Sequence, residues 1–449
     1  MKLQSTGLAT DLYQLTMAAG YFVNKSDQTA TFELFVRKFP ANRSFLIAAG
    51  LEQALKYITE LKFLPEEIDY LSNLAVFSHV PDGFFDYLST FRFSGDVWAM
   101  PEGTPFFPYE PLLRVTAPII EAQLLETYLL STINFQTMIA SKAARIVEAA
   151  VGRGVVEFGT RRAHGMAAGL YAARAAFIGG CVGTSNVEAG FRWGIPVSGT
   201  MAHSWVMSYE NERDAFRAYA DLFPETAVLL LDTYDTITGA KIAGELKKKL
   251  MGVRLDSGDF ADLSRGVRQI LDDAGLKDTK ILASGDLDET KIAALVESGS
   301  PIDSFGVGTM LSTSWDAPSL GGVYKLVEQS INGKVEAKMK LSDQKSFYPG
   351  KKQVWRKTGA DGKFSHDVIS RADEEISDAT SLLECVMHEG RIVKESSSLD
   401  KIQAKAKADL ERVPVDVKRL NDPVRYRVEY SKELEELRQK VMTEITHLK

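Results

Sequence analysis

The middle third of the chain alternates between short apolar runs and longer segments with helical periodicity. In segments such as DFADLSRGVRQILDDAGL (259–276), apolar residues recur every three or four positions, as on one face of an amphipathic helix. Strands that alternate with helices at intervals of roughly 20–30 residues form βα units that pair in parallel. The apolar runs lie at 155–158, 177–181, 195–198, 228–231, 253–255, 281–283 and 303–307.

These seven runs, with 323–326 as a candidate eighth, predict an α/β fold built on an irregular closed (β/α) barrel. With about 175 residues, this barrel would be smaller than the usual barrel of roughly 250. We expect it to occupy residues 151–330 and to hold the active site.

The two ends of the chain mix helices and strands without this rhythm. Residues 29–39 are rich in β-forming side chains, 44–61 have the pattern of an amphipathic helix, and Asn332-Gly333 predicts a hairpin turn. The last segment is too small to form its own core. We therefore expect a second α/β domain, in which 1–150 supplies the N-terminal part and 331–449 packs on it.

Composition restricts the class of protein. Among 449 residues, 53 Lys and Arg stand against 60 Asp and Glu, and the formal charge of −7 argues against a protein that mainly binds nucleic acid. A hydrophobic share of 45% suits a globular protein, and no apolar stretch approaches the roughly 20 residues of a membrane span. With two cysteines and no secretory signal pattern, we expect a cytoplasmic protein.

Each predicted strand is followed by a cluster of polar residues and glycines. In parallel α/β folds, the C-terminal ends of the strands form the rim of the active site. One such cluster is as consistent with helix capping as with chemistry, but seven together favour a site for an anionic, phosphorylated substrate. The clusters are EFGTRR (157–162), GTSN (183–186), SGTMAHS (198–204), LDTYD (231–235), RLDSGD (254–259), SGD (284–286) and GVGT (306–309).

The acidic residues of this rim suggest a cation. Four converging carboxylates would repel one another without a cation among them, which points to a phosphate that carries Mg²⁺. Neither H-E-x-x-H nor a zinc spacing of Cys and His occurs, so the metal ligands stay unassigned. His203 directly follows a strand end, and this position favours a chemical role over a structural one. The four carboxylates are those of Asp232, Asp235, Asp256 and Asp286.

The glycine-rich turns at 284–286 and 306–309 follow adjacent late strands. Barrels often build a phosphate cradle there from backbone N–H groups, and glycine lets the backbone approach the anion closely. The sequence contains neither G-x-x-x-x-G-K-[ST] nor the third glycine of a dinucleotide fingerprint. A P-loop is therefore excluded, and a Rossmann site is disfavoured.

Several of these clusters form a recognisable set with one motif near the N-terminus. The set comprises TDLYQLTM (10–17), EFGTRRAHG (157–165), GTSNV (183–187), GTMAHS (199–204), DTYDT (232–236), VRLDSGD (253–259) and the GVGT turn. From Thr10 to at least Lys325, the sequence resembles the nicotinate phosphoribosyltransferases, which join nicotinic acid to phosphoribosyl pyrophosphate and give nicotinate mononucleotide. The family's fold, an irregular barrel beside a domain made from both chain ends, agrees with the organisation above. Beyond about residue 330 we find no diagnostic motif.

The resemblance implies how nicotinate would be bound. Tyr13 would reach into the site of a partner subunit and stack on the pyridine ring opposite Phe158, so a homodimer with shared active sites is expected. Arg161, Thr200 and Arg254 would bind the carboxylate, which a planar guanidinium can grip through two hydrogen bonds.

The resemblance also implies which groups bind ribose, phosphate and ATP. Asp232 and Asp256 would face ribose hydroxyls or the Mg²⁺-loaded pyrophosphate. His203 matches the histidine that the family phosphorylates with ATP, the coupling substrate, and it completes the catalytic set with the two aspartates. The phosphate-binding residues would be Ser284, Gly285, Asp286, Gly306, Gly308 and Thr309.

Alternatives exist for the substrate and for the reaction. Relatives that use nicotinamide carry an acidic residue where this chain has Ser185, which favours nicotinate because a carboxylate would repel it. Nicotinamide or quinolinate phosphoribosyltransferases are the alternatives within this chemistry. A sugar-phosphate aldolase or isomerase barrel would want a Schiff-base lysine or a metal-binding histidine set at the strand ends, and neither is visible in the sequence. A third hypothesis is a sensor that binds a nucleotide without catalysis.

Overall fold

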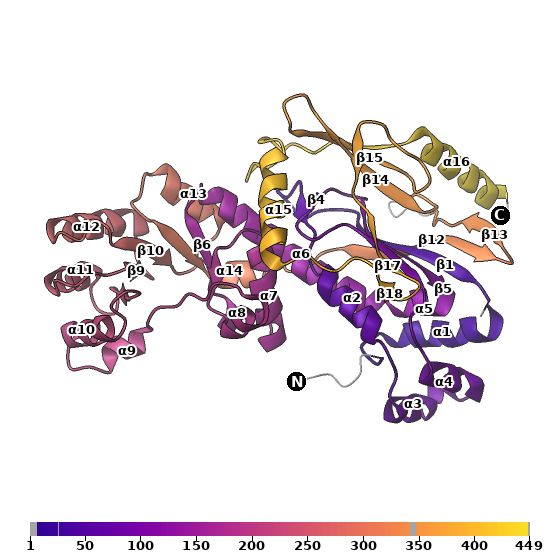
Figure 1. Ribbon diagram of the computed structural model, residues 1–449, viewed down its shortest axis with the longest axis horizontal. Coiled ribbons are helices and arrows are strands. Elements are labelled where there is room, and N and C mark those ends of the chain that lie inside the picture. The colour runs from indigo at the N-terminus through magenta and orange to yellow at the C-terminus, as the bar shows by residue number, and fades with distance from the viewer. Residues whose placement is uncertain (1–6, 26, 342–346, 448–449) are drawn as a thin grey trace. The chain divides into compact units, whose positions relative to one another are not determined.

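The computed structural model describes residues 7–25, 27–341 and 347–447 and divides the chain into two compact units (Figure 1). The first unit combines the segment up to Thr137 with the segment from Ser319 onward, and the second comprises Met138–Pro318. The expected boundaries at 150 and 330 differ from these. Helix α6 (Glu126–Ala149) runs across the first boundary, and strand β12 (Gly322–Ile331) belongs to a sheet of the first unit.

Both ends of the chain contribute to a seven-stranded sheet in the first unit. Its order is β13-β12-β1-β5-β3-β17-β18, with antiparallel pairing throughout. The run of β-forming residues becomes β1, which is buried at every position after Thr29. Asn332 and Gly333 form the expected hairpin turn, and both have the positive φ that such a turn requires. The strands are β1 (Thr29–Val36), β3 (Asp96–Ala99), β5 (Pro111–Pro118), β12, β13 (Lys334–Ala337), β17 (Glu384–His388) and β18 (Arg391–Ile392).

Smaller sheets and several helices complete the first unit. A four-stranded sheet has the order β16-β14-β15-β19, and β2 pairs with β4. These strands are β2 (Leu46–Ile47), β4 (Pro105–Phe106), β14 (Lys352–Thr358), β15 (Phe364–Arg371), β16 (Ala379–Ser381) and β19 (Val428–Tyr430). The helices are α1 (Leu12–Asn24), α2 (Leu51–Glu60), α3 (Pro65–Ser72), α4 (Asp82–Ser89), α5 (Ile119–Leu124), α15 (Leu399–Arg412) and α16 (Lys432–His447).

The second unit carries a six-stranded parallel sheet of order β7-β6-β11-β10-β9-β8. Figure 1 shows helices α10, α11 and α12 side by side next to β9 and β10. The strands are β6 (Gly154–Glu157), β7 (Gly183–Thr184), β8 (Val228–Leu230), β9 (Gly252–Leu255), β10 (Lys280–Ser284) and β11 (Ser304–Val307). The helices are α7 (Met166–Ile178), α8 (Val187–Trp193), α9 (His203–Met207), α10 (Glu212–Leu222), α11 (Thr236–Glu245), α12 (Phe260–Asp273), α13 (Glu289–Glu297) and α14 (Thr309–Ser312).

Neighbouring strands of this sheet are consecutive in the chain, except that the last strand pairs with the first, as in a barrel. From β6 the chain reaches β7, then Val197, which bridges Thr184 in parallel, and then β8 to β11, and β11 pairs again with β6. Within the described ranges, Val197 and β8 are not paired, so the expected closed barrel is not observed. We call this opening between Val197 and β8 the seam. The fold is a mixed α/β structure with a parallel sheet that is open along the seam.

Two of the expected barrel strands are wrong, and the expected strand at 195–198 is reduced to the single bridge between Val197 and Thr184. Residues 177–181 include the end of α7, and the strand follows at β7. The end of this helix is buried, and a short buried helical run has the same apolar pattern as a strand. Residues 323–326 lie in β12, which pairs antiparallel with β1 in the first unit.

None of the helices in the described part of the chain is long and apolar enough to cross a membrane.

Candidate active site

A cluster of charged and hydroxyl side chains lies at the C-terminal end of β9. Arg254 Nη2 is 3.2 Å from Asp256 Oδ1, and Arg254 Nη1 donates a hydrogen bond to Thr200 Oγ1 at 2.6 Å. His203, the first residue of α9, has Nε2 3.9 Å from Asp256 Oδ2 and Nδ1 3.2 Å from Thr233 Oγ1. The structure therefore brings together residues from three separate turns of the rim.

The Arg254 guanidinium has a donor that the described residues do not use. Its Nε is buried and has no hydrogen-bond partner in the described part of the protein. Its Nη1 reaches the Met201 carbonyl oxygen at 3.3 Å as well as Thr200. Because buried donors nearly always find an acceptor, this N–H is suited to an anionic ligand.

The two oxygens of Asp232 have different environments. Oδ2 accepts hydrogen bonds from the Asp256 N–H at 3.2 Å and from Ser257 Oγ at 2.5 Å, which orients the turn after β9. Oδ1 is buried and lacks a partner among the residues that the structure describes. This oxygen is therefore available to accept from a ligand hydroxyl or to bind a cation.

Asp256 is held in its ionised form. Burial raises the pKa of its carboxyl, but the hydrogen bond from the Ser284 hydroxyl and the positive charge of Arg254 outweigh burial, and a protonated His203 would add to them. The net pKa lies below the ordinary value of an aspartate. The residue consequently carries a full negative charge at neutral pH.

Two glycines near Ser284 allow neighbouring groups to pack closely against the backbone. Gly285 has a φ of +107°, and a Cβ at this position would collide with the carbonyl oxygen of Asp256. A Cβ on Gly306, in β11, would lie 2.5 Å from the ring of Phe158 and 3.2 Å from the Cβ of Ser284. Phe158 therefore lies against the bare backbone of β11, next to the cluster.

The carboxylates fit a magnesium ion only in part. The described residues contain no group of three or more His, Cys, Asp or Glu side chains that could hold a metal. Asp232 and Asp256 nevertheless lie next to each other, and one Asp232 oxygen lacks a partner among the described side chains and backbone. This arrangement suits Mg²⁺ held by one or two carboxylates together with the phosphates of a substrate.

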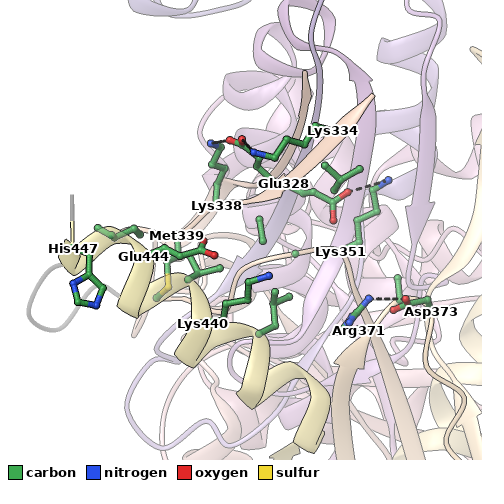
Figure 2. Close-up of a pocket in the computed structure, with 18 residues that line it drawn as sticks. Glu328, Lys334, Lys338, Met339, Lys351, Arg371, Asp373, Lys440, Glu444 and His447 are labelled. Carbon is green, nitrogen blue, oxygen red and sulfur yellow. Dashed lines mark hydrogen bonds and ion pairs between the residues drawn. The ribbon is translucent and has the colours of Figure 1, made fainter. Parts of the chain in front are cut away.

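A large cavity lies in the first unit, and the residues that line it are distant in sequence from those of the cluster. It has a volume of about 1020 Å³ and is lined by β12, β13, the end of β15 and α16 (Figure 2). Several of its charged side chains form ion pairs, with Lys351 Nζ 3.3 Å from Glu328 and Arg371 Nη2 2.7 Å from Asp373. None of the residues expected in the site is among the described residues that line it.

Comparisons with known proteins cover most of the chain. Sequence models of the nicotinate phosphoribosyltransferase (NAPRTase) N-terminal domain, the NAPRTase family and the NAPRTase C-terminal domain match residues 8–134, 154–351 and 376–438. Nicotinate phosphoribosyltransferase pncB2 of Mycobacterium tuberculosis is 44% identical over 421 residues, 92% of this chain and 89% of that protein. The chain belongs to the nicotinate phosphoribosyltransferase family.

Other relatives in the nicotinate phosphoribosyltransferase family agree with this assignment. The enzyme of that name from Bacillus subtilis is 39% identical over 465 residues, 96% of this chain and 94% of its own length. The crystal structure of human nicotinic acid phosphoribosyltransferase superposes with a TM-score of 0.84 at 30% identity and covers 96% of this chain and 99% of that chain. The match to the C-terminal domain shows that the segment without a diagnostic motif also belongs to the family.

Several expected site residues are not part of the cluster around Arg254, Asp256 and His203. Arg161 is exposed in a single 3₁₀ turn, and Ser185 follows β7, where its N–H donates to the Glu157 carbonyl oxygen at 2.9 Å. Thr309 begins α14 directly after Gly308. Tyr13 lies near the start of α1 in the first unit and is half exposed.

One of the four rim aspartates has a structural role, and another lies in an exposed turn. Asp235 caps α11 by accepting from the Thr238 N–H at 2.8 Å, and hydrogen bonding to the Thr238 side chain and then to its N–H lowers the pKa of Asp235. Asp286 is exposed at a φ of +47°, and its carbonyl oxygen accepts from Lys291 Nζ at 2.7 Å. The expected convergence of four carboxylates is therefore wrong for Asp235.

Glu157, for which no role was expected, is fully buried at the end of β6. It accepts hydrogen bonds from the Gly159 N–H and from Thr184 Oγ1, the latter at 2.6 Å. Burial raises the pKa of this carboxyl. Glu157 thus joins the turn that carries Phe158 to the turn that carries Ser185. The only signal in the sequence is an acidic residue at the end of an apolar strand.

Proposed function

We propose that this protein makes nicotinate mononucleotide from nicotinate and phosphoribosyl pyrophosphate, with hydrolysis of ATP to ADP and phosphate. The observation that carries the proposal is the cluster of Arg254, Asp256 and His203 at the C-terminal end of a parallel sheet in a member of this family. The reaction would be the entry of nicotinic acid into NAD synthesis.

The substrate carboxylate would be bound by Arg254. Its Nε donor, which has no partner among the described residues, and its charge suit a carboxylate, and Thr200 is already hydrogen-bonded to the same guanidinium. The pyridine ring would stack on Phe158, whose ring is about half buried beside β11. Arg161 and Ser185 would lie at the edge of the same pocket. The absence of an acidic side chain at Ser185 supports nicotinate rather than nicotinamide.

The bond-forming step is a ribosyl transfer. The lone pair of the pyridine nitrogen forms a bond to C1′ of the ribose while the bond from C1′ to the pyrophosphate oxygen breaks, and the leaving group takes that electron pair. Asp256 and Asp232 face the positive charge that develops on the ribose ring and orient its hydroxyls. Magnesium, bound with the pyrophosphate, would neutralise the leaving group. The 5′-phosphate would be held by Ser284, Gly285, Asp286, Gly306, Gly308 and Thr309.

His203 would couple this reaction to ATP. Its Nε2 faces the Asp256 carboxylate, which favours a proton on that nitrogen and leaves the lone pair on Nδ1, beside the Thr233 hydroxyl. Nδ1 would attack the γ-phosphorus as the bond to ADP breaks, and water would later release phosphate. While it exists, the phosphohistidine adds negative charge and acceptor oxygens to the rim.

The family fold implies an irregular barrel, and we propose that the seam is its irregular side. Residues 198–227, which include Thr200 and His203, connect Val197 to β8 across the seam. The chain has only two cysteines, which fits a reducing compartment such as the cytoplasm.

A direct assay tests the function. The purified full-length chain, given nicotinate, phosphoribosyl pyrophosphate, Mg²⁺ and ATP, is expected to form nicotinate mononucleotide and pyrophosphate together with ADP. Chromatography of the nucleotides and a coupled pyrophosphate assay measure this. More efficient consumption of nicotinamide or quinolinate would contradict the substrate assignment, and turnover of a sugar phosphate alone would contradict the reaction class.

We further propose a homodimer in which Tyr13 completes the partner's site. Helix α1 exposes Leu12, Tyr13 and Met17, an apolar surface on a helix that would otherwise face water. Mixing the variants Tyr13→Ala and Arg254→Met, each nearly inactive, is then expected to restore activity, because a mixed dimer has one site with both native residues. Steady-state rates after co-refolding measure this. No recovery, with mixed dimers shown by mass spectrometry, would place Tyr13 in its own subunit's site or outside any site.

A further inference from the structure

A buried ion cluster in the second unit links α6 to the start of α13. Lys142 Nζ lies 2.5 Å from Glu289 Oε2, and Arg145 Nε lies 3.2 Å from Glu289 Oε1. Lys142, Arg145 and Glu289 are exposed by only 2%, 7% and 5%. Lys142 and Arg145 are three residues apart on α6 and so share one face of this helix.

Glu289 is the first residue of α13 and directly follows the turn 284–288, which carries half of the proposed phosphate cradle. This turn is compact, since Asp288 accepts from the Lys291 N–H at 2.8 Å and the Asp286 carbonyl oxygen accepts from Lys291 Nζ at 2.7 Å. A displacement of Glu289 would therefore move the turn that carries Asp286 and Gly285.

Lys142 also reaches the other half of the cradle. Its Nζ is 2.8 Å from Asp316 Oδ1. Asp316 follows α14 in a segment closed by backbone hydrogen bonds from the Thr313 N–H to the Thr309 carbonyl oxygen and from the Trp315 N–H to the Met310 carbonyl oxygen. One ammonium group thus holds the segments that follow both phosphate turns.

A stabilising role alone is a poor explanation for this arrangement. Burying charged groups costs several kcal/mol of desolvation per ion, and replacing a buried ion pair by apolar side chains is often neutral or stabilising. Ion pairs do, however, fix distance and direction more strictly than apolar contacts do. The cluster is therefore better explained by a need for fixed geometry.

We propose that Lys142 is a positioning residue that sets the spacing between the turns 284–288 and 306–309 and so the affinity for the 5′-phosphate of the ribosyl substrate. This inference rests on the proposed function of the two turns. Lys142 itself touches no substrate, and it acts through Glu289 and Asp316.

The variant Lys142→Met keeps the length of the side chain and removes its charge. It is expected to raise the KM for phosphoribosyl pyrophosphate about 10- to 100-fold, as misplaced binding groups do, with the KM for nicotinate within about twofold. Ribose 5-phosphate, which carries the 5′-phosphate, should inhibit the variant more weakly by the same factor, whereas inhibition by pyrophosphate should be unchanged. A merely structural role would not separate these two inhibitors.

The matched control is Lys280→Met. Lys280 is the first residue of β10, and the turn 284–288 begins at the other end of this strand. Lys280 forms an exposed ion pair with Asp303 at 3.0 Å, so the same substitution breaks a pair far from the turns along the strand. Its kinetic constants are expected to equal those of the unaltered protein. Asp316→Asn removes one anchor of Lys142 from the surface without leaving a buried charge, and we expect it to raise the KM for phosphoribosyl pyrophosphate about threefold.

These variants separate the possible outcomes. An unaltered protein that makes no nicotinate mononucleotide contradicts the proposed function. If it makes the nucleotide but a folded Lys142→Met keeps its KM for phosphoribosyl pyrophosphate and its inhibition by ribose 5-phosphate, the positioning role is wrong. Should Lys142→Met not fold, an unchanged KM in Asp316→Asn also contradicts the role.

Discussion

Replacing Arg254 by methionine is expected to lower kcat/KM for nicotinate by roughly 10²- to 10³-fold, equivalent to about 3–4 kcal/mol. The guanidinium is largely buried, since the Arg254 side chain is only 14% exposed. Among the described cations of the cluster, it alone has a buried donor, Nε, without a hydrogen-bond partner. Without it, the substrate carboxylate would lose its counter-charge in a site that excludes much of the water. Steady-state kinetics with nicotinate as the varied substrate measure the loss.

The amide analogue makes this prediction sharper. Nicotinamide has no charge to lose, so its poor kcat/KM should change by less than about tenfold in Arg254→Met, and the preference for the acid should largely disappear. Arg254→Lys, which keeps the charge but not the planar fork, is expected to lie between the two. Arg265→Met, in an exposed pair with Asp262 at 3.3 Å, is the control. A loss confined to the KM for phosphoribosyl pyrophosphate would contradict the role of Arg254.

Replacing His203 by alanine is expected to abolish the stimulation of the reaction by ATP and to leave a slow synthesis that does not depend on ATP. The side chain is 41% exposed, so γ-labelled ATP can reach it, and the alanine variant should take up no label. Thr233→Val, which removes the hydroxyl beside Nδ1, should reduce labelling without abolishing it. Rates with and without ATP, together with acid-labile labelling of the protein, measure these effects.

A surface histidine is the control for this experiment. His388 is 60% exposed and forms a pair with Asp96 at 2.9 Å in the first unit, so His388→Ala should keep both label and stimulation. Equal dependence on ATP in His203→Ala and in the unaltered protein would rule out the phosphohistidine.

The sequence predicted the strands of the parallel sheet better than their closure. Residues 228–231, 253–255, 281–283 and 303–307 became β8 to β11, because runs of buried β-branched and aliphatic residues between helical segments have few other solutions. The end of α7 was mistaken for a strand because burial on all sides removes the helical period. Which sheet a strand joins depends on contacts distant in sequence, so 323–326 could not be assigned correctly.

The candidate site shows the same limit at the level of side chains. A position at or just after the end of an expected strand was sufficient to select Arg254, Asp256 and His203 as site residues. It did not distinguish Asp235, a helix cap, from Asp232, because both are aspartates in the same turn and differ only in hydrogen-bond partners. Glu157 was missed since its partners lie on two different turns.

The seam leaves β8 at one edge of the parallel sheet of the second unit. Strands β10 and β11 have a neighbour on both sides, whereas β8 is paired only with β9 in the ranges described. Amide protons of β8 should therefore exchange with deuterium before those of β11. The phosphate of the ribosyl substrate would then be bound at β10 and β11, inside the sheet. His203, which would gain and lose a phosphoryl group, would lie near the edge strand β8. Phosphorylation of His203 could then change the conformation near β8 without displacing the phosphate-binding turns that follow β10 and β11.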